Sequence, residues 1–309
     1  MTKSDANWHI LGAGAIGSLW ASYAYKAGRA MPLILKDNES LKQYQTQGGL
    51  LFESAAGGAE MLPLPVCIAA QLNQSISHLL VCTKAQHTEA AITAIADKIE
   101  DDAYIVLLQN GLGVAEKLRQ QFPKARLLQA STTEGAFRKD RFHIVHAGRG
   151  ETFFGPHRST QDLSPDEITQ LASALSPAPL QVTATENIEK ILWRKLAVNC
   201  AINPLTVKYR CRNGELLDNP AALQEMATLV DEIVLLSKAL GRESWVEKLL
   251  EQVHQVAANT ALNRSSMLQD IEAGRDTEIS FITGYLLKKA SSIGIELTVN
   301  ESLFHQFDK

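Results

Sequence analysis

The chain has 309 residues, 45% of them hydrophobic and 21% charged, which is typical of a globular protein with room for two domains. A net charge of -4 and the lack of any long basic run argue against nucleic acid as a partner. No stretch approaches the roughly 18 apolar residues that a membrane span needs, and the chain does not open on a signal segment. We therefore expect a cytoplasmic protein that binds neither nucleic acid nor membrane.

The residue types that bind metals are too scattered to form a site. The four cysteines lie far apart, mostly in apolar segments, and we expect reduced core thiols: Cys67, Cys82, Cys200 and Cys211. His143 and His146 belong to a strand-like segment, where their spacing places the two rings on opposite faces. We predict no metal site.

A glycine-rich turn follows the first apolar segment. WHIL precedes GAGAIG, and residues 18–28 then have helical spacing that ends at Gly28. This is G-x-G-x-x-G between a strand and a helix, where glycines allow a pyrophosphate to approach the helix N-terminus. The predicted cofactor-binding turn comprises Gly12, Ala13, Gly14, Ala15, Ile16 and Gly17.

The second expected strand, residues 32–35, ends beside Lys36. An NAD site usually has an acidic residue here for the ribose 2′-hydroxyl, whereas a cation favours the 2′-phosphate of NADPH. Asp37 follows directly and leaves NAD open, and Lys36 is also compatible with a solvated loop residue.

Further strands place polar residues at the same sheet edge. We predict a hairpin around residues 55–58 that leads back to the sheet. A buried strand at 79–83 then precedes Lys84 and Gln86, and a helix at 88–99 is followed by a strand that ends before Asn110. Ligands of parallel sheets bind beyond the carboxyl ends of strands, so Lys84 and Asn110 are candidate ligand contacts. Asn110 and Gly111 are equally typical of a plain turn.

The amino-terminal half is predicted to end near Glu186. We predict a strand that ends in polar residues 131–134, followed by segments 142–149 and 151–156, which pair and close the sheet. A helix then starts with Ser164 as N-cap and Pro165 as its first residue, and a last strand covers 180–185. The fold class that we predict is α/β: a Rossmann-type doubly wound sheet in residues 1–186, then an all-helical domain in residues 187–309.

The helix predicted from Glu186 places Lys195, Asn199 and Asn203 on one stripe, because they are four residues apart. Its remaining residues are mostly apolar, and polar groups buried there need partners. The stripe either caps loops and bridges domains or lines a functional cleft, where a desolvated lysine is an acid near neutral pH. Pro204 is expected to break or kink this helix.

Helices are expected for the rest of the chain. We predict one at 220–240, ended by Gly241, one from Trp245 to about Leu268, and a last helical segment that finishes the fold after Gly274. Asp276 or Thr277 would cap that segment, with Glu278 in its first turn.

Five motifs resemble the ketopantoate reductase (2-dehydropantoate 2-reductase) family over nearly the whole chain: LGAGAIG, LLQNGLG, LWRKLAVNCAINPLT, NGEL and SSMLQDIEAGRDTEISFITG. The resemblance implies reduction of 2-dehydropantoate to (R)-pantoate by NADPH, in pantothenate and coenzyme A biosynthesis. It implies that hydride passes from nicotinamide C4 to the C2 ketone.

The resemblance also assigns roles to residues of this chain. Lys195 matches the catalytic lysine, and Lys36 stands where a basic residue, often arginine, meets the 2′-phosphate. Lys84 and Asn110 match positions beside the cofactor and the reacting carbonyl. The remaining matches are to substrate-binding residues, namely Asn199, Asn203, Ser266 and Glu278, with Ser266 and Glu278 assigned to the substrate carboxylate and 4-hydroxyl.

Two other functions are weighed against this one. A reductase of another small 2-oxo acid would share Lys195 but not the pocket, and a substrate without the 4-hydroxyl would leave Glu278 unpaired. A non-catalytic NADPH sensor would need the cofactor site but no proton donor. The sequence is compatible with a monomer or a dimer.

Overall fold

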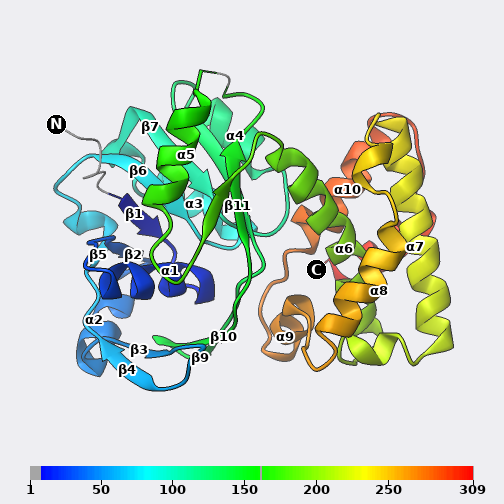
Figure 1. The fold of residues 1–309 in the computed structure, drawn as a ribbon, viewed down its shortest axis with the longest axis horizontal. Coiled ribbons are helices and arrows are strands. Elements are labelled where there is room, and N and C mark those ends of the chain that lie inside the picture. The colour runs from blue at the N-terminus through cyan, green and yellow to red at the C-terminus, as the bar shows by residue number, and fades with distance from the viewer. Residues whose placement is uncertain (1–7, 161, 309) are drawn as a thin grey trace. The chain divides into compact units, whose positions relative to one another are not determined.

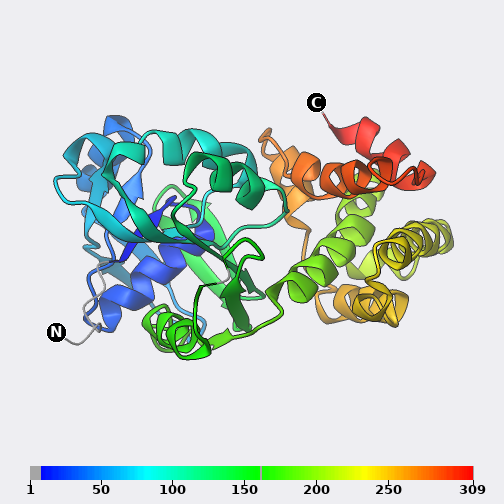
Figure 2. The same ribbon diagram turned by 90° about the horizontal axis from the view of Figure 1, so that it is seen from above.

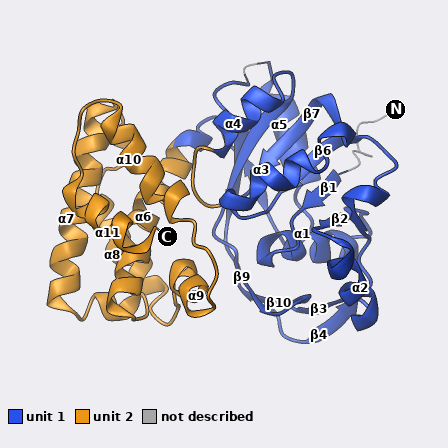
Figure 3. Cartoon of the chain, turned by 180° about the vertical axis from the view of Figure 1, so that it is seen from behind, with its two compact units in different colours: residues 1–109, 114–189 blue, residues 110–113, 190–309 orange. Residues whose placement is uncertain are grey.

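The structure is a computed structural model that describes residues 8–160 and 162–308 (Figure 1). The chain forms two compact units, coloured separately in Figure 3. One contains the described residues up to Gln109 together with Val114–Glu189, and the other contains Asn110–Gly113 and Lys190 onward. Four residues from the middle of the amino-terminal half thus belong to the second unit.

The first unit is built on an eight-stranded sheet in the described part of the chain, with the order β12-β11-β8-β7-β6-β1-β2-β5. Six neighbouring strands of this sheet are parallel to one another, namely β8, β7, β6, β1, β2 and β5. Strand β11 runs antiparallel to β8. Their bounds are β1 Trp8–Leu11, β2 Leu33–Leu35, β5 Val66–Ile68, β6 Ile76–Val81, β7 Ile99–Leu107, β8 Arg126–Thr132, β11 Thr152–Pro156 and β12 Val182–Ala184. The strand order reverses at β1, so the carboxyl ends of β1 and β6 form the position at which such sheets bind ligands.

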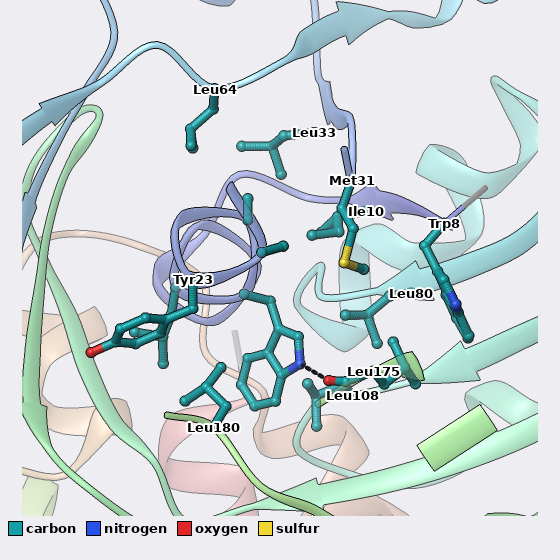
Figure 4. Packing of buried hydrophobic residues seen from close by; sticks show 14 of the residues in the cluster. Trp8, Ile10, Tyr23, Met31, Leu33, Leu64, Leu80, Leu108, Leu175 and Leu180 are labelled. Atoms are coloured by element: carbon teal, nitrogen blue, oxygen red, sulfur yellow. Dashed lines mark hydrogen bonds between the residues drawn. The ribbon is translucent and has the colours of Figure 1, made fainter. Parts of the chain in front are cut away.

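Helices cover both faces of this sheet (Figure 2). Their bounds are α1 Ala15–Lys26, α2 Asn38–Gln47, α3 Ala85–Thr93, α4 Val114–Gln121 and α5 Pro165–Ala174. On the face of α1 and α5, Trp20 Nε1 donates to the carbonyl of Leu175 at 3.1 Å among buried leucines (Figure 4). The predicted Ser164 cap is present, and Glu167 completes a capping box with it. The predicted α/β doubly wound fold is confirmed.

A second sheet of the first unit was not anticipated. It has the order β4-β3-β10-β9, with bounds β3 Leu50–Glu53, β4 Ala59–Leu62, β9 Gly135–Asp140 and β10 His143–Gly148. The predicted hairpin around residues 55–58 is formed by β3 and β4, and the chain then returns to the main sheet as β5, as predicted. The pairing of β3 with β10 was not expected. The predicted pairing of segments 142–149 and 151–156 is wrong, because β10 pairs with β9 and β3 while β11 pairs with β8.

A buried polar network joins this second sheet to α1. Tyr23 Oη lies 2.7 Å from His146 Nδ1, and His146 Nε2 lies 2.8 Å from a Glu134 carboxylate oxygen. The ring of Tyr23 also packs edge-on against Phe52 of β3. The side chains of His146 and Glu134 are 0% and 3% exposed, so each needs its partner because water cannot replace it.

Replacing Glu134 with alanine is expected to destabilise the protein by about 1–3 kcal/mol, because it leaves a buried ring nitrogen of His146 without its acceptor. Glu134→Gln keeps an acceptor oxygen and should retain most of that stability. Urea unfolding of both variants measures the difference. Equal unfolding free energies for the alanine variant and the unchanged protein would contradict this role.

The second unit is helical in its described residues, as predicted. Its helices are α6 Ile188–Tyr209, α7 Pro220–Ala239, α8 Leu249–Asn259, α9 Ser266–Glu272, α10 Thr283–Ser291 and α11 Thr298–Phe307. As predicted, α7 begins at Pro220 and Gly241 follows its end, with a φ of 69°. Asn219 is its N-cap. Among the helices of residues 8–160 and 162–308, none has the length and apolarity to cross a membrane.

Of the two outcomes expected at Pro204, the break does not occur, because helix α6 continues through this residue to Tyr209. Two other sequence predictions for this unit are wrong. Trp245–Leu268 is not one helix: a 3₁₀ turn at Glu243–Trp245, α8 and α9 divide it, and Ser265 caps α9. The segment after Gly274 does not finish the fold, because α11 follows.

Candidate cofactor and active site

The glycine turn connects β1 to α1 and packs closely against β6. Gly12 has a φ of 109°, and a Cβ there would lie 2.8 Å from the backbone nitrogen of Thr83. A Cβ on Gly17 would lie 2.1 Å from the carbonyl oxygen of Gly12. The protein's own backbone therefore requires glycine at both positions.

Gly14 is different, because nothing in the protein requires it to be glycine. Its φ of -77° and ψ of -174° are open to any residue, and the nearest atom to an added Cβ is 3.8 Å away. Gly14 is the N-cap of α1, with no side-chain cap and no acidic residue in the first turn of the helix. Ala13, Ala15 and Ile16 are partly exposed beside it. The helix N-terminus thus offers N–H groups and space to an anion.

Strand β2 is followed by an exposed cation and by a carboxylate that caps the next helix. Lys36 is exposed directly after β2. Asp37 caps α2, with Oδ1 accepting hydrogen bonds from the Ser40 hydroxyl at 2.6 Å and from the Ser40 backbone nitrogen at 2.8 Å. These hydrogen bonds are the main reason that the pKa of Asp37 is lowered. The Asp37 carboxylate therefore caps a helix, a role that its position in the sequence did not indicate.

The tips of β6 and β7 are joined by hydroxyl groups. Lys84 is the N-cap residue of α3, which begins at Ala85 and not at Thr88 as predicted. The Thr88 hydroxyl lies 2.8 Å from that of Thr83 and donates to Gln109 Oε1 at 2.9 Å. This series of hydrogen bonds fixes the ends of both strands beside the glycine turn. Sequence reasoning missed it, although polar residues at strand ends were its signal.

In the helical unit, Lys195 of α6 lies near Glu278. Lys195 is partly buried, and burial lowers its pKa to about 8, while the charge of Glu278 acts in the opposite direction. Asn110 Nδ2 donates to a Glu278 carboxylate oxygen at 3.4 Å. An ammonium, a carboxylate and a carboxamide that are distant in the sequence are therefore brought together, and the ammonium is a stronger acid than a lysine in water.

A short backbone contact holds Asn110 in place. The Leu112 nitrogen donates to the Phe281 carbonyl at 2.8 Å. Gly111 has a φ of 80°, and a Cβ there would lie 2.7 Å from Phe281 Cβ. The chain thus bends at Asn110 and Gly111, and the Asn110 amide contacts Glu278.

The other predicted substrate-binding residues are placed less closely. Asn203 is buried on α6 and Asn199 is partly exposed. Ser266 is exposed at the start of α9, whereas its neighbour Ser265 caps that helix and contacts the Thr206 hydroxyl at 2.6 Å.

Metal-binding groups do not gather in the described residues: no set of three or more His, Cys, Asp or Glu side chains there could hold an ion. His143 Nε2 lies 2.7 Å from a carboxylate oxygen of Glu53, while His146 contacts Glu134. The cysteines are free; Cys200 is buried and the other three are partly exposed.

Family models match both parts of the chain. A family described as "Ketopantoate reductase PanE/ApbA" matches residues 8–159, and its C-terminal counterpart matches residues 187–309. The chain belongs to the ketopantoate reductase PanE/ApbA family. Members of the family are NAD(P)-binding oxidoreductases, and this chain has both parts of the family architecture.

Relatives of the chain are similar over almost their whole length. A 2-dehydropantoate 2-reductase from Vibrio cholerae is 34% identical, over 96% of this chain and 95% of the relative. One from Shigella flexneri is 36% identical, over 96% and 92%. A solved D-mandelate dehydrogenase, with NADH and anilino(oxo)acetate, has a TM-score of 0.87 at 24% identity, with 96% of each chain covered, and shares the fold.

Proposed function

We propose that the protein reduces 2-dehydropantoate to pantoate with NADPH, as a step of pantothenate and coenzyme A biosynthesis. Residues 1–186 would bind the dinucleotide, and residues 187–309 would bind the substrate. The observation that carries the proposal is the position of Lys195, whose pKa burial lowers to about 8, within electrostatic reach of Glu278, which Asn110 contacts. A proton donor active near neutral pH is what ketone reduction requires.

The glycine turn fits a dinucleotide. The absence of a side chain at Gly14 leaves space that no other protein atom fills. The adjacent N-terminus of α1 suits a pyrophosphate. Lys36 suits a 2′-phosphate, which supports NADPH over NADH, and Lys84 would also contact the cofactor. When bound, the cofactor supplies the hydride.

The residues of the second unit would bind the substrate and supply the proton. Lys195 would hydrogen-bond the C2 oxygen and protonate it as negative charge develops. Asn110, Asn199 and Asn203 are neutral amides that orient a small anion without offering a competing acid. Ser266 would bind the substrate carboxylate. Glu278 is a carboxylate, and it would accept a hydrogen bond from the 4-hydroxyl.

The proposed substrate is tested by following NADPH oxidation with 2-dehydropantoate, pyruvate, 2-oxoisovalerate and phenylglyoxylate in parallel. We expect kcat/KM for 2-dehydropantoate to exceed the others by on the order of 100-fold, because the other three leave Glu278 without a hydroxyl partner. Glu278→Gln should reduce this preference, since a neutral amide oxygen is a weaker acceptor than a carboxylate.

The alternatives give different results in the same assay. A preference for any of the other three acids would identify a reductase of another 2-oxo acid and overturn the proposed substrate. Binding of NADPH without its oxidation by any acid would instead identify a sensor.

A further inference from the structure

The second sheet places an arginine beside the tip of β2. Arg141 lies in the turn between β9 and β10, and its Nη2 donates to the Ser40 hydroxyl at 2.6 Å. Ser40 belongs to the first turn of α2, just after Lys36 and Asp37. The guanidinium also lies 5.9 Å from the ring centroid of Phe142. An arginine distant in the sequence is thus held against Ser40, four residues after Lys36.

Lys36 and Arg141 act on the same carboxylate. After the hydrogen bonds from Ser40, the positive charges of both residues help to lower the pKa of Asp37. Asp37 is already engaged in the cap of α2. The other nearby carboxylate, Glu39, is 3.9 Å from Arg141 Nη1, and its side chain is 74% exposed. An exposed ion pair at this distance is weak, so a phosphate can displace Glu39 from the guanidinium.

We propose that Arg141 is a specificity-determining residue that binds the 2′-phosphate of NADPH together with Lys36. The inference rests on the proposed use of NADPH. In this fold the tip of the second strand meets the ribose 2′ group. Lys36 supplies a point charge there, and Arg141 supplies the planar donor group that lysine lacks, with one edge fixed by Ser40. The second sheet then has a function: it positions this arginine.

Binding of two nucleotides tests the proposal without the reaction. Adenosine 2′,5′-bisphosphate and 5′-AMP differ only by the 2′-phosphate, and calorimetric titration gives Kd for each. We expect the unchanged protein to prefer the bisphosphate. Arg141→Ala should weaken bisphosphate binding about tenfold or more and leave 5′-AMP binding unchanged, because a charge-assisted hydrogen bond is lost only with the former.

Three further variants make the test specific. Lys36→Ala should also weaken bisphosphate binding, and Arg141→Lys should give an intermediate loss because it keeps the charge but not the planar donors. Arg138→Ala, which removes an exposed arginine from the same hairpin, should change neither Kd. The thermal midpoint of each variant checks that it is folded.

Two results would overturn the proposal, and they differ. If Arg141→Ala binds the bisphosphate as tightly as the unchanged protein while Lys36→Ala does not, Arg141 has no part in binding but NADPH use stands. If the unchanged protein binds both nucleotides equally, the NADPH assignment fails and the inference about Arg141 fails with it.

Discussion

Replacing Lys195 with alanine should lower kcat for 2-dehydropantoate by roughly 10²–10⁴-fold, because the substrate oxygen loses its proton donor. The Kd of NADPH should change little, since the residues suited to the dinucleotide belong to the first unit. Stopped-flow reduction and a separate NADPH titration measure the two quantities. Lys208→Ala is the control, because it removes an exposed lysine of the same helix that pairs with Glu225. Turnover by the Lys195 variant at the normal rate would remove the assignment.

The pH dependence provides a second measure of the same group. Lys195 must be protonated to act as an acid, so kcat should fall as pH rises through about 8. Stability changes in the opposite direction. The pKa is lowered from 10.5 to about 8 on folding, so between these values the unfolded chain binds more protons and stability increases with pH. Lys195→Met should lack that increase. Glu278→Gln removes a charge that raises the pKa of Lys195, and should move the fall in kcat to lower pH.

Gly17→Ala and Gly14→Ala are expected to separate packing from cofactor binding. At Gly17 the new Cβ would lie 2.1 Å from the Gly12 carbonyl oxygen, and both positions are fixed by backbone. The overpacking should cost about 3 kcal/mol or more and abolish NADPH binding, because β1 and α1 must move apart.

At Gly14 the same methyl group meets no protein atom within 3.8 Å. Gly14→Ala should therefore unfold at the same urea concentration as the unchanged protein but bind NADPH at least about tenfold more weakly, since the methyl group takes space that suits the pyrophosphate. Normal NADPH binding by the Gly14 variant would show that the turn binds no phosphate at this point.

The sequence predicted the elements whose signals are local. The glycine turn, the cap of α5 and the start and end of α7 depend on neighbouring residues, and each is present. Helix α2 was missed because it is mostly polar and its buried residues are few. Pro204 was expected to break or kink α6, but the helix does not end there. Residues 201–207 are all buried, and continued burial offsets the hydrogen bond that proline cannot donate.

The parts that could not be predicted depend on contacts between distant segments. The division between α8 and α9 is fixed by the backbone of Asn213 and Gly214, which donate to the carbonyls of Asn263 and Ala261. In the site, the sequence selected Lys195, Asn110 and Glu278 without indicating that they meet. The contact of Ser265 with Thr206 and the position of Arg141 carry no local signal, because each is defined by its partner.

The pairing of β3 with β10 has a consequence for the order of folding. The strands are parallel, and β5 to β8 of the main sheet lie between them in the sequence. Closing so long a loop is entropically costly until the intervening strands have assembled, so this pair should form after the main sheet. The turn that holds Arg141 is then among the last parts of the first unit to become ordered. A nascent chain would acquire its nucleotide fold first and its ability to distinguish the phosphorylated cofactor only when folding is complete.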